Sequence, residues 1–322
     1  AVYHAVRRCG RTHMSAPDLI AAQSSSGIVE DLALDAIEAE GWTVGDTLGQ
    51  GTFGRVVQVT RKSDGVQAAC KIIELPDDED EKKAIDNEMM IMKALAHPGI
   101  VNLYHGFESD THAFMTLELC KGGELFDRIV ALKSFNETMA ASVTYTVLVA
   151  LEYMHGKGIV HRDLKPENIC FTTSERRWIK LIDLGAAGVL RGDEGLSGLH
   201  GTPLYVAPEV TPWFWVENAQ QAARCGRYGK EVDYWSLGIS LFVMLSGEAP
   251  FEQGPDVERL LSDICSASID TSSVTWRSIS DNAKALLAGL LTRDPRKRTG
   301  LEQLRASPWL AEALEELHQS DP

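Results

Sequence analysis

Residues 159–171, which read IVHRDLKPENICF, constrain the fold and chemistry of this chain more than any other stretch. Within it a carboxylate, an ammonium and a carboxamide follow at short spacings, as Asp163, Lys165 and Asn168. The carboxylate can accept a hydroxyl proton, the ammonium can neutralise charge on a moving phosphoryl group, and the amide oxygen can ligate a metal ion that holds phosphates. Each residue alone is typical of a polar surface loop, but the whole string HRDLKPEN indicates a phosphoryl-transfer site.

A glycine-rich turn joins two segments of alternating polarity, residues 42–48 and 55–60. The alternation predicts a β-hairpin, and its tip fits the pattern G-x-G-x-x-G-x-V over residues 49–56. Glycines let a backbone lie close over phosphates, where a Cβ would intrude. A dinucleotide-binding turn shares the glycine spacing, but it requires a helix directly after the glycines, whereas Val56 continues into strand sequence. The pattern therefore favours a hairpin that covers phosphates.

Lys71 lies among apolar neighbours in a third predicted strand, residues 66–73. A lysine in such surroundings requires an anionic partner, because an unpaired buried charge is costly. The acidic tract at residues 77–81 is typical of a solvated loop and helix start. Glu88 is the better partner, since it lies beside the apolar stripe of a helix predicted over residues 82–95.

Asp183 begins the sequence Asp-Leu-Gly after a strand predicted over residues 178–182. An isolated Asp-Leu-Gly is typical of a turn. Its position after HRDLKPEN and a strand instead indicates a second metal ligand. Further strands are predicted at residues 100–103 and 113–119, and further helices at residues 124–130, 138–155, 237–245, 280–291 and 301–310, the second of these helices capped by Asn136.

These motifs, in this order, resemble those of eukaryotic protein kinases, and the KPEN version of the loop is similar to serine/threonine rather than tyrosine kinases. GGELFDRI, GTPLYVAPEV and MLSGEAPF look most like the calcium/calmodulin-dependent protein kinase group. The resemblance covers residues 42–310. It implies an α+β, two-lobed protein kinase fold. The N-lobe would hold a five-stranded antiparallel sheet and one helix, which the family calls αC, and the C-lobe would be mainly helical.

The resemblance divides the chain into four parts. Residues 1–40 would be a partly flexible N-terminal extension with a helix near residues 29–40, residues 41–120 the N-lobe and hinge, residues 121–310 the C-lobe, and residues 311–322 a short acidic tail. An insert near residues 211–227 holds Trp213, Phe214 and Trp215. These aromatic residues either pack locally or form a docking patch.

The resemblance implies ATP and Mg²⁺ as cofactors and gives each motif position a role. Asp163 would orient and deprotonate the acceptor hydroxyl, Lys165 would neutralise charge, and Asn168 would hold metal. Lys71 and Glu88 would form the ion pair of the active state. Asp183 would be the other metal ligand. The ATP site would comprise Leu48, Gly49, Gln50, Gly51, Thr52, Phe53, Gly54, Val56, Ala69, Lys71, Glu118, Cys120 and Cys170. The peptide site would comprise Glu124, Glu167, Thr202 and Leu204.

The acids Glu124 and Glu167 predict protein substrates with arginine three residues before the acceptor Ser or Thr, because a guanidinium suits a bidentate carboxylate partner. The competing interpretation is that Glu124 merely favours a helix N-terminus and Glu167 makes an internal salt bridge. In the family pattern Glu209 would pair with Arg298, and Asp233 would brace the catalytic loop, residues 159–171.

Arg162 is a cation that in this family often requires a phosphate on the activation segment, which would be residues 183–209 here, to order that segment. Ser197 is the main candidate for modification, and Asp193 or Glu194 can supply an anion without it. We expect activity that does not depend on phosphorylation.

Composition limits the partners. The formal net charge of -15 disfavours nucleic acid and anionic membranes, and no apolar run is long enough for a membrane span. Scattered cysteines without metal spacing predict reduced thiols and a cytoplasmic location. No calmodulin-binding helix or EF-hand loop follows the kinase-like region, so control by calmodulin or a calcium sensor is possible but not encoded in these residues.

The chain does not begin with methionine, as expected of a fragment or processed form, and we expect a monomer. Two other classes of function stay open. A pseudokinase scaffold would be marked by loss of Lys71, Asp163 or Asp183, and all three are present. A small-molecule kinase of related fold would lack the activation segment that ends in GTPLYVAPE.

Overall fold

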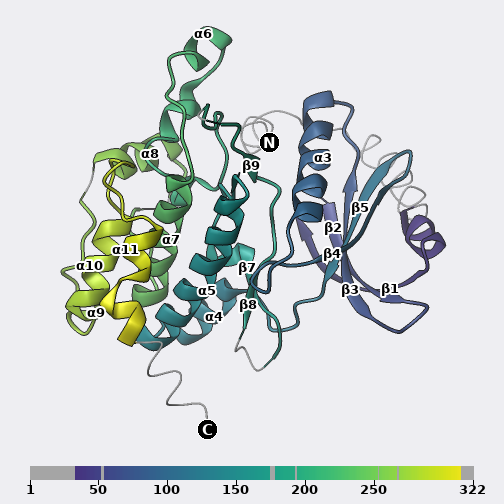
Figure 1. The fold of residues 1–322 in the computed structure, drawn as a ribbon, viewed down its shortest axis with the longest axis horizontal. Helices are drawn as coiled ribbons and strands as arrows, with labels where there is room; N and C mark the ends of the chain where they lie inside the picture. The colour runs from purple at the N-terminus through teal and green to yellow at the C-terminus, as the bar shows by residue number, and fades with distance from the viewer. Residues whose placement is uncertain are drawn as a thin grey trace. The chain divides into compact units, whose positions relative to one another are not determined.

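The computed structural model describes residues 33–51, 54–174, 178–192, 194–252, 254–266 and 268–312 (Figure 1). The chain folds as two compact units. The first contains the described residues up to Ala96 together with Val101–Cys120, and the second contains His97–Ile100 together with the described residues from Lys121 onward. In these ranges no helix is long and apolar enough to cross a membrane.

The first unit is built on a five-stranded antiparallel sheet, as predicted. Its strands lie in the order β1 (Trp42–Gly51), β2 (Gly54–Arg61), β3 (Gln67–Glu74), β5 (His112–Glu118) and β4 (Leu103–Glu108). Helix α3 (Glu79–Ala94) begins within the acidic tract, because the Asp78 side chain accepts hydrogen bonds from the amides of Asp80 and Glu81.

The two faces of this sheet carry different residues. On β3, Cys70 and Ile72 point to one face and Lys71 to the other, because successive side chains alternate. The register places Val57 opposite Cys70 and Phe114 opposite Ile72, so these buried side chains form a hydrophobic core on the first face. Lys71 is left on the opposite face.

A helix over residues 33–39 covers this core. Its Ala33 and Ile37 are 2% and 0% exposed and belong to the same cluster as Trp42 and Ile72. Figure 1 shows this helix, in purple, on the other side of the sheet from α3. Residues 1–32, which include the start of the predicted helix, lie outside the described part. A segment that the sequence assigns to an extension therefore completes the core of the first unit.

Replacing Ile37 with alanine should lower the free energy of unfolding of the first unit by about 2–5 kcal/mol, because it leaves a cavity in a closed core. Urea unfolding monitored by circular dichroism would measure the change. Met90→Ala is the control, since Met90 is 55% exposed on α3 and its loss should matter little. Equal stability of the two variants would show that the helix is not part of the core.

The second unit is mainly helical, with two small sheets. In chain order its elements are α4 (Leu125–Leu132), α5 (Glu137–Gly156), β6 (Ile159–Val160), η1 (Pro166–Asn168), β7 (Ile169–Phe171), β8 (Ile179–Leu181), β9 (Gly188–Val189), η2 (Pro203–Tyr205), η3 (Thr211–Trp215), α6 (Ala219–Ala222), α7 (Glu231–Ser246), α8 (Val257–Ser266), α9 (Val274–Arg277), α10 (Asp281–Leu290) and α11 (Leu301–Arg305). Strand β6 pairs with β9, and β7 with β8. Helix α7 is central, because every residue from Val232 to Leu245 is buried.

Several predicted boundaries are wrong; for example, the helix expected over residues 237–245 begins at Glu231, as α7. The strand expected at residues 100–103 begins only at Leu103, because Ile100 instead bridges to Leu181 of β8. The helix expected over residues 301–310 is interrupted after Arg305, since Pro308 disfavours helical backbone in the residue before it. The predicted cap of α5 is confirmed: Asn136 accepts a hydrogen bond from the Met139 amide.

The insert near residues 211–227 contains η3 and the short helix α6, which Figure 1 shows at the end of a projection. Trp213 packs locally, and its indole N–H donates to the carbonyl of Gly226. Phe214 and Trp215 stack edge to face, and Trp215 is 47% exposed. Local packing therefore accounts for Trp213 and Phe214, while Trp215 remains at the surface.

Candidate active site

The first unit contains the predicted ion pair. Lys71 Nζ lies 2.7 Å from Glu88 Oε1, and the two side chains are 18% and 7% exposed. Because Glu88 lies on α3 and Lys71 on β3, the pair ties the helix to the sheet face opposite the core. A nearly buried carboxylate of this kind needs a fixed cation beside it. The lysine is thus held at a defined position on that face.

The glycine-rich hairpin has the predicted form. Gln50 pairs with Arg55 and Gly51 with Gly54, at the end of β1 and the start of β2. Gly54 has φ +129°, and a Cβ built there would lie 1.9 Å from the carbonyl oxygen of Ile72, so glycine is required. Leu48 and Gly49 precede the tip and are exposed. Thr52 and Phe53, also predicted to contact ATP, lie outside the described residues.

The face that carries Lys71 also carries apolar residues of the predicted ATP site. Val56 pairs directly with Lys71, and Ala69 pairs with Leu117, so the side chains of all four point to one side. Glu118 ends β5, and its carboxylate accepts a hydrogen bond of 2.7 Å from Asn102 Nδ2. The contacts of Glu118 and Cys120 with ATP stay predictions.

The second unit contains the catalytic loop, with Asp163 at the centre of its hydrogen bonds. Asp163 Oδ1 accepts hydrogen bonds of 2.8 Å from both the amide and the hydroxyl of Thr202. Asp163 Oδ2 lies 3.2 Å from Asn168 Nδ2 and 3.3 Å from Lys165 Nζ. Lys165 also donates to the Thr202 hydroxyl, at 2.6 Å. Three predicted site residues therefore converge on Asp163.

Asp233 of α7 holds the backbone of the catalytic loop, as the family pattern predicts. The carboxylate accepts 2.9 Å hydrogen bonds from the amides of His161 and Arg162. His155 Nε2 lies 2.8 Å from the same carboxylate, and both side chains are almost fully buried. Burial alone would raise the pKa of Asp233, but the contacts with His155 and the His161 amide outweigh it and hold this pKa below its usual value. Asp233 thus stays charged and fixes the loop backbone.

The sequence did not predict the contact between His155 and Asp233. His155 lies near the end of α5, where helical periodicity gives no indication of a partner in α7. Its other ring nitrogen lies 3.3 Å from the hydroxyl of Tyr234. These two contacts orient the ring and make His155 a support of the loop.

The predicted metal ligands Asn168 and Asp183 lie at the same end of one hairpin. Ile169 pairs with Leu181 across β7 and β8, and the Ile182 amide donates to the Asn168 carbonyl. Asn168 directs its Nδ2 to Asp163, so its amide oxygen points elsewhere. Among the described residues, no group of three or more His, Cys, Asp or Glu is arranged to hold a metal ion. An amide and a carboxylate nevertheless fit Mg²⁺, which usually takes one or two protein ligands and completes its shell with water and phosphate oxygens.

The other predicted site residues also lie in the second unit. Cys170 is buried on β7, and its thiol donates to the Gly123 carbonyl at 3.1 Å. Glu124 directly precedes α4, and Glu167 lies within η1 of the catalytic loop. Leu204 is buried in η2, two residues after Thr202.

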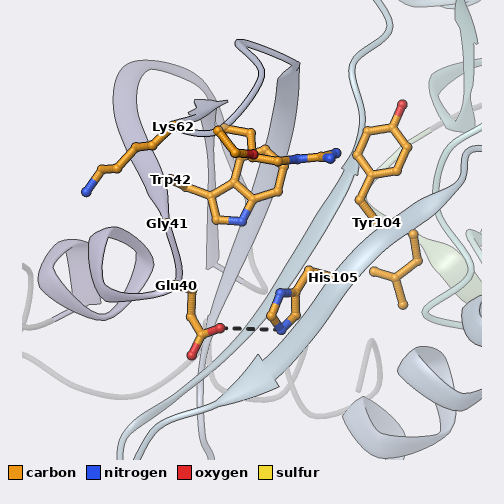
Figure 2. A pocket seen from close by; sticks show the side chains of 9 residues that line it. Glu40, Gly41, Trp42, Lys62, Tyr104 and His105 are labelled. Atoms are coloured by element: carbon orange, nitrogen blue, oxygen red, sulfur yellow. Dashed lines mark ion pairs between the residues drawn. The ribbon is translucent and has the colours of Figure 1, made fainter.

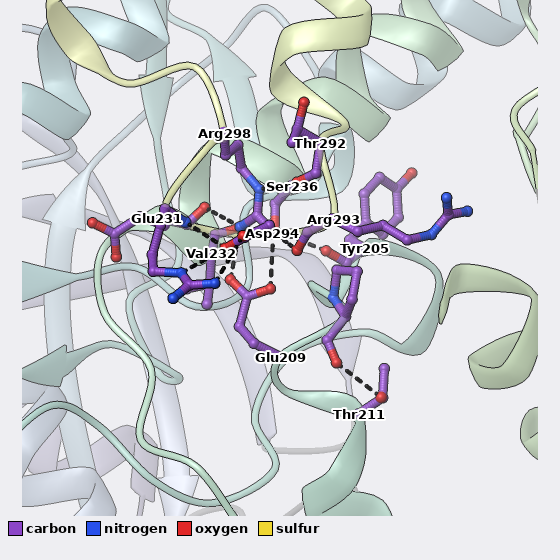
Figure 3. A network of polar contacts seen from close by, with 12 residues as sticks. Tyr205, Glu209, Thr211, Glu231, Val232, Ser236, Thr292, Arg293, Asp294 and Arg298 are labelled. Carbon is purple, nitrogen blue, oxygen red and sulfur yellow. Dashed lines mark hydrogen bonds and ion pairs between the residues drawn. The ribbon is translucent and has the colours of Figure 1, made fainter. Parts of the chain in front are cut away.

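The predicted structural pair of Glu209 and Arg298 is confirmed (Figure 3). The guanidinium of Arg298 donates to both carboxylate oxygens of Glu209, at 2.7 and 2.8 Å. It also donates to the carbonyls of Glu231, Thr292 and Arg293. The Arg298 side chain is 0% exposed, so this bidentate pair holds the end of the activation segment inside the second unit.

A cavity of about 840 Å³ in the first unit contains none of the predicted site residues (Figure 2). The guanidinium of Arg61 lies 5.1 Å from the ring centre of Trp42 and 5.9 Å from that of Tyr104. His105 Nε2 lies 3.6 Å from Glu40 Oε2. Arg61, Glu40 and His105 thus contact other residues of the cavity wall, whereas Lys62 Nζ lies 3.9 Å from Glu38 Oε2, outside the wall.

Comparisons with known proteins agree with this geometry. The family model for the protein kinase domain matches residues 42–310. The chain is 36% identical over 280 residues to calcium-dependent protein kinase 1 of Arabidopsis thaliana, covering 84% of this chain and 43% of the relative. It is 38% identical over 265 residues to a probable myosin light chain kinase of Dictyostelium discoideum, covering 82% of each.

A third relative is calcium-dependent protein kinase 5 of Plasmodium falciparum, 36% identical over 269 residues, covering 81% of this chain and 44% of the relative. The chain thus spans less than half the length of these two calcium-dependent kinases. The names of all three relatives agree with the resemblance to the calcium/calmodulin-dependent group. Because the family model matches the chain from the first strand of the sheet to the last helices, the chain belongs to the protein kinase domain family.

Proposed function

We propose that this chain transfers the γ-phosphoryl group of ATP to Ser or Thr of protein substrates that carry arginine three residues before the acceptor. Support for the transfer comes from the kinase family match and from the paired Lys71 and Glu88. Lys71, Asp163 and Asp183 are all present, which disfavours a pseudokinase scaffold. Thr202 is bound to Asp163 and Leu204 is buried, which supports an ordered segment beside Asp163 where a peptide would bind and disfavours a small-molecule kinase.

The observation that carries the arginine preference is the unsatisfied carboxylate of Glu167. Its Oε2 atom is buried and has no hydrogen-bond partner among the described residues. A buried carboxylate oxygen without a donor is unfavourable, so a donor from a bound substrate would stabilise it. The interpretation of Glu167 as half of an internal salt bridge finds no support in this arrangement.

Glu124 adds a second acid to the same surface. It precedes α4, where the helix dipole favours an acid, but its side chain makes no capping hydrogen bond to the helix. Burial raises the pKa of Glu124, and the nearby charges of Asp127 and Glu167 raise it further. Neighbouring carboxylates favour a cation between them. A guanidinium fits best, because its planar donors can serve two carboxylates at once.

The roles of the residues in transfer follow from their contacts. Asp163, anchored through Oδ1 by Thr202, would orient the acceptor hydroxyl and take its proton. Lys165, bound to both Asp163 and Thr202, would lie beside the negative charge of the phosphoryl group. Asn168 and Asp183 would hold Mg²⁺, which when bound neutralises charge on the ATP phosphates. A cytoplasmic location, which rests on the scattered cysteines, and a monomeric state belong to the same proposal.

Replacing Glu124 or Glu167 with glutamine should lower kcat/KM for a peptide with arginine at the third position upstream by roughly 10- to 100-fold, the range for a hydrogen bond to a charged group. The same peptide with alanine at that position should be phosphorylated equally by all variants. A positional peptide library with purified enzymes would measure both. Glu302→Gln, which removes an exposed acid on α11, is the matched control.

The raised pKa of Glu124 supplies a second readout of the same proposal. Glu124 takes up a proton at higher pH than an ordinary glutamate, so its charge is lost first as pH falls. The KM for the arginine peptide should therefore rise on acidification, and the KM for the alanine peptide should not. Indifference of the wild type to upstream arginine, or a preference for acidic sites, would contradict the proposal.

A further inference from the structure

The guanidinium of Arg162, the residue before Asp163, donates hydrogen bonds to neutral oxygens. Its Nε donates to the Ala186 carbonyl at 2.6 Å, and its Nη2 donates to the Ala187 carbonyl at 3.2 Å. Its Nη1 lies 3.5 Å from the hydroxyl of Tyr228. All these acceptors are neutral oxygens of the second unit. Among the described residues, which do not include Asp193, three nitrogens of the guanidinium thus donate to neutral oxygens.

Gly188 of β9 makes this position of the guanidinium possible. A Cβ built at residue 188 would lie 2.8 Å from Arg162 Cζ and 3.0 Å from its Nε and Nη2. Any larger side chain would therefore displace the guanidinium from the two carbonyls. The absence of a side chain at this position lets the charged plane lie against the backbone of β9.

Tyr228 connects this guanidinium to the activation segment. Its side chain is buried, and its hydroxyl lies 2.9 Å from the carbonyl oxygen of Gly198 and 3.2 Å from that of Ser197. Its backbone pairs with Leu196 in both directions, at 2.7 and 3.0 Å. One hydroxyl can donate to the segment while accepting from Arg162. The same residue therefore holds the segment by its backbone and by its side chain.

The held segment leads directly to the catalytic carboxylate. Four residues after Gly198, the amide and hydroxyl of Thr202 bind Asp163 Oδ1. Arg162 precedes Asp163, and its amide is bound to Asp233. Tyr228 thus joins the two chain segments that meet at Asp163, one through Arg162 and one through Ser197 and Gly198.

We infer that Tyr228 is a positioning residue whose hydroxyl takes the place of an activating phosphate, so that the segment is ordered without modification of Ser197. The inference rests on the proposed kinase function. It explains why Arg162 needs no acid from the activation segment. Neutral oxygens already fix its guanidinium, and hydrogen bonds from a charged donor are stronger than those between neutral groups.

Tyr228→Phe removes only the hydroxyl and should lower kcat about tenfold, with KM for ATP changed less than twofold, since ATP contacts are not touched. Hydrogen exchange of the amides at residues 196–202 should become about tenfold faster. Tyr145→Phe is the matched control, because Tyr145 is exposed on α5. Gly188→Ala should reproduce the faster exchange by displacing Arg162 while leaving the Tyr228 hydroxyl in place.

Dephosphorylated wild type and Ser197→Ala should be as active as untreated enzyme. Activity that appears only after phosphorylation of Ser197 would overturn the inference. So would a Tyr228→Phe enzyme with unchanged kcat and unchanged exchange at residues 196–202. If the wild type transfers no phosphate to any peptide, the proposed function fails, and the exchange measurement still decides whether Tyr228 orders the segment.

Discussion

Asp163→Asn should lower kcat by about 10²–10⁴-fold, the range contributed by a positioned general base. Asparagine has the shape of aspartate and can still accept the Thr202 hydrogen bonds through its oxygen. It cannot accept the hydroxyl proton, and it removes the negative charge beside Lys165. Steady-state transfer of phosphate from ATP to a peptide would measure the loss, and the thermal unfolding midpoint should change little.

The control is Asp281→Asn, which makes the same chemical change at an exposed residue in the first turn of α10. It should leave kcat unchanged. Binding of a fluorescent ATP analogue to Asp163→Asn should also be retained, because Asp163 is assigned no contact with ATP. Near-normal turnover by Asp163→Asn would remove it from the catalytic role. Loss of ATP binding would place it among the nucleotide contacts instead.

Much of this site was predictable because its residues are close in sequence. Asp163, Lys165 and Asn168 lie on one loop, so their spacing alone places them within reach of one another. Alternation along β3 and periodicity along α3 were enough to select Glu88 as the partner of Lys71, because both patterns fix which face a side chain takes. The cap of α5 by Asn136 was a local signal of the same kind.

The parts that the sequence could not predict depend on contacts distant along the chain. His155 meets Asp233 across 78 positions, and Arg162 meets Tyr228 across 66. Neither histidine nor tyrosine carries a spacing signal for such a partner, and the helix at residues 33–39 likewise packs on strands that follow it. Hydrophobic periodicity reports which face is buried, but it does not report what covers that face.

Arg298→Ala should lower the free energy of unfolding of the second unit by about 3–5 kcal/mol, because removing one member of a buried ion pair leaves the other charge uncompensated. Here Glu209 would lose both donors of a bidentate pair, and three backbone carbonyls would also lose their partner. Urea unfolding, monitored by hydrogen exchange of the α7 amides, would measure the loss. Arg224→Ala, which removes an exposed arginine, is the control.

The double variant Arg298→Leu with Glu209→Leu separates the charge effect from packing. If the cost comes from the uncompensated carboxylate, the double variant should be more stable than Arg298→Leu alone, because well-packed apolar residues can replace a buried pair at little cost. If the two single changes simply add, the pair contributes no coupling and the carbonyl contacts of Arg298 carry the stability. Catalysis gives an independent readout, since Glu209 ends the segment that delivers Thr202 to Asp163 and the single variants should therefore lose kcat together with stability.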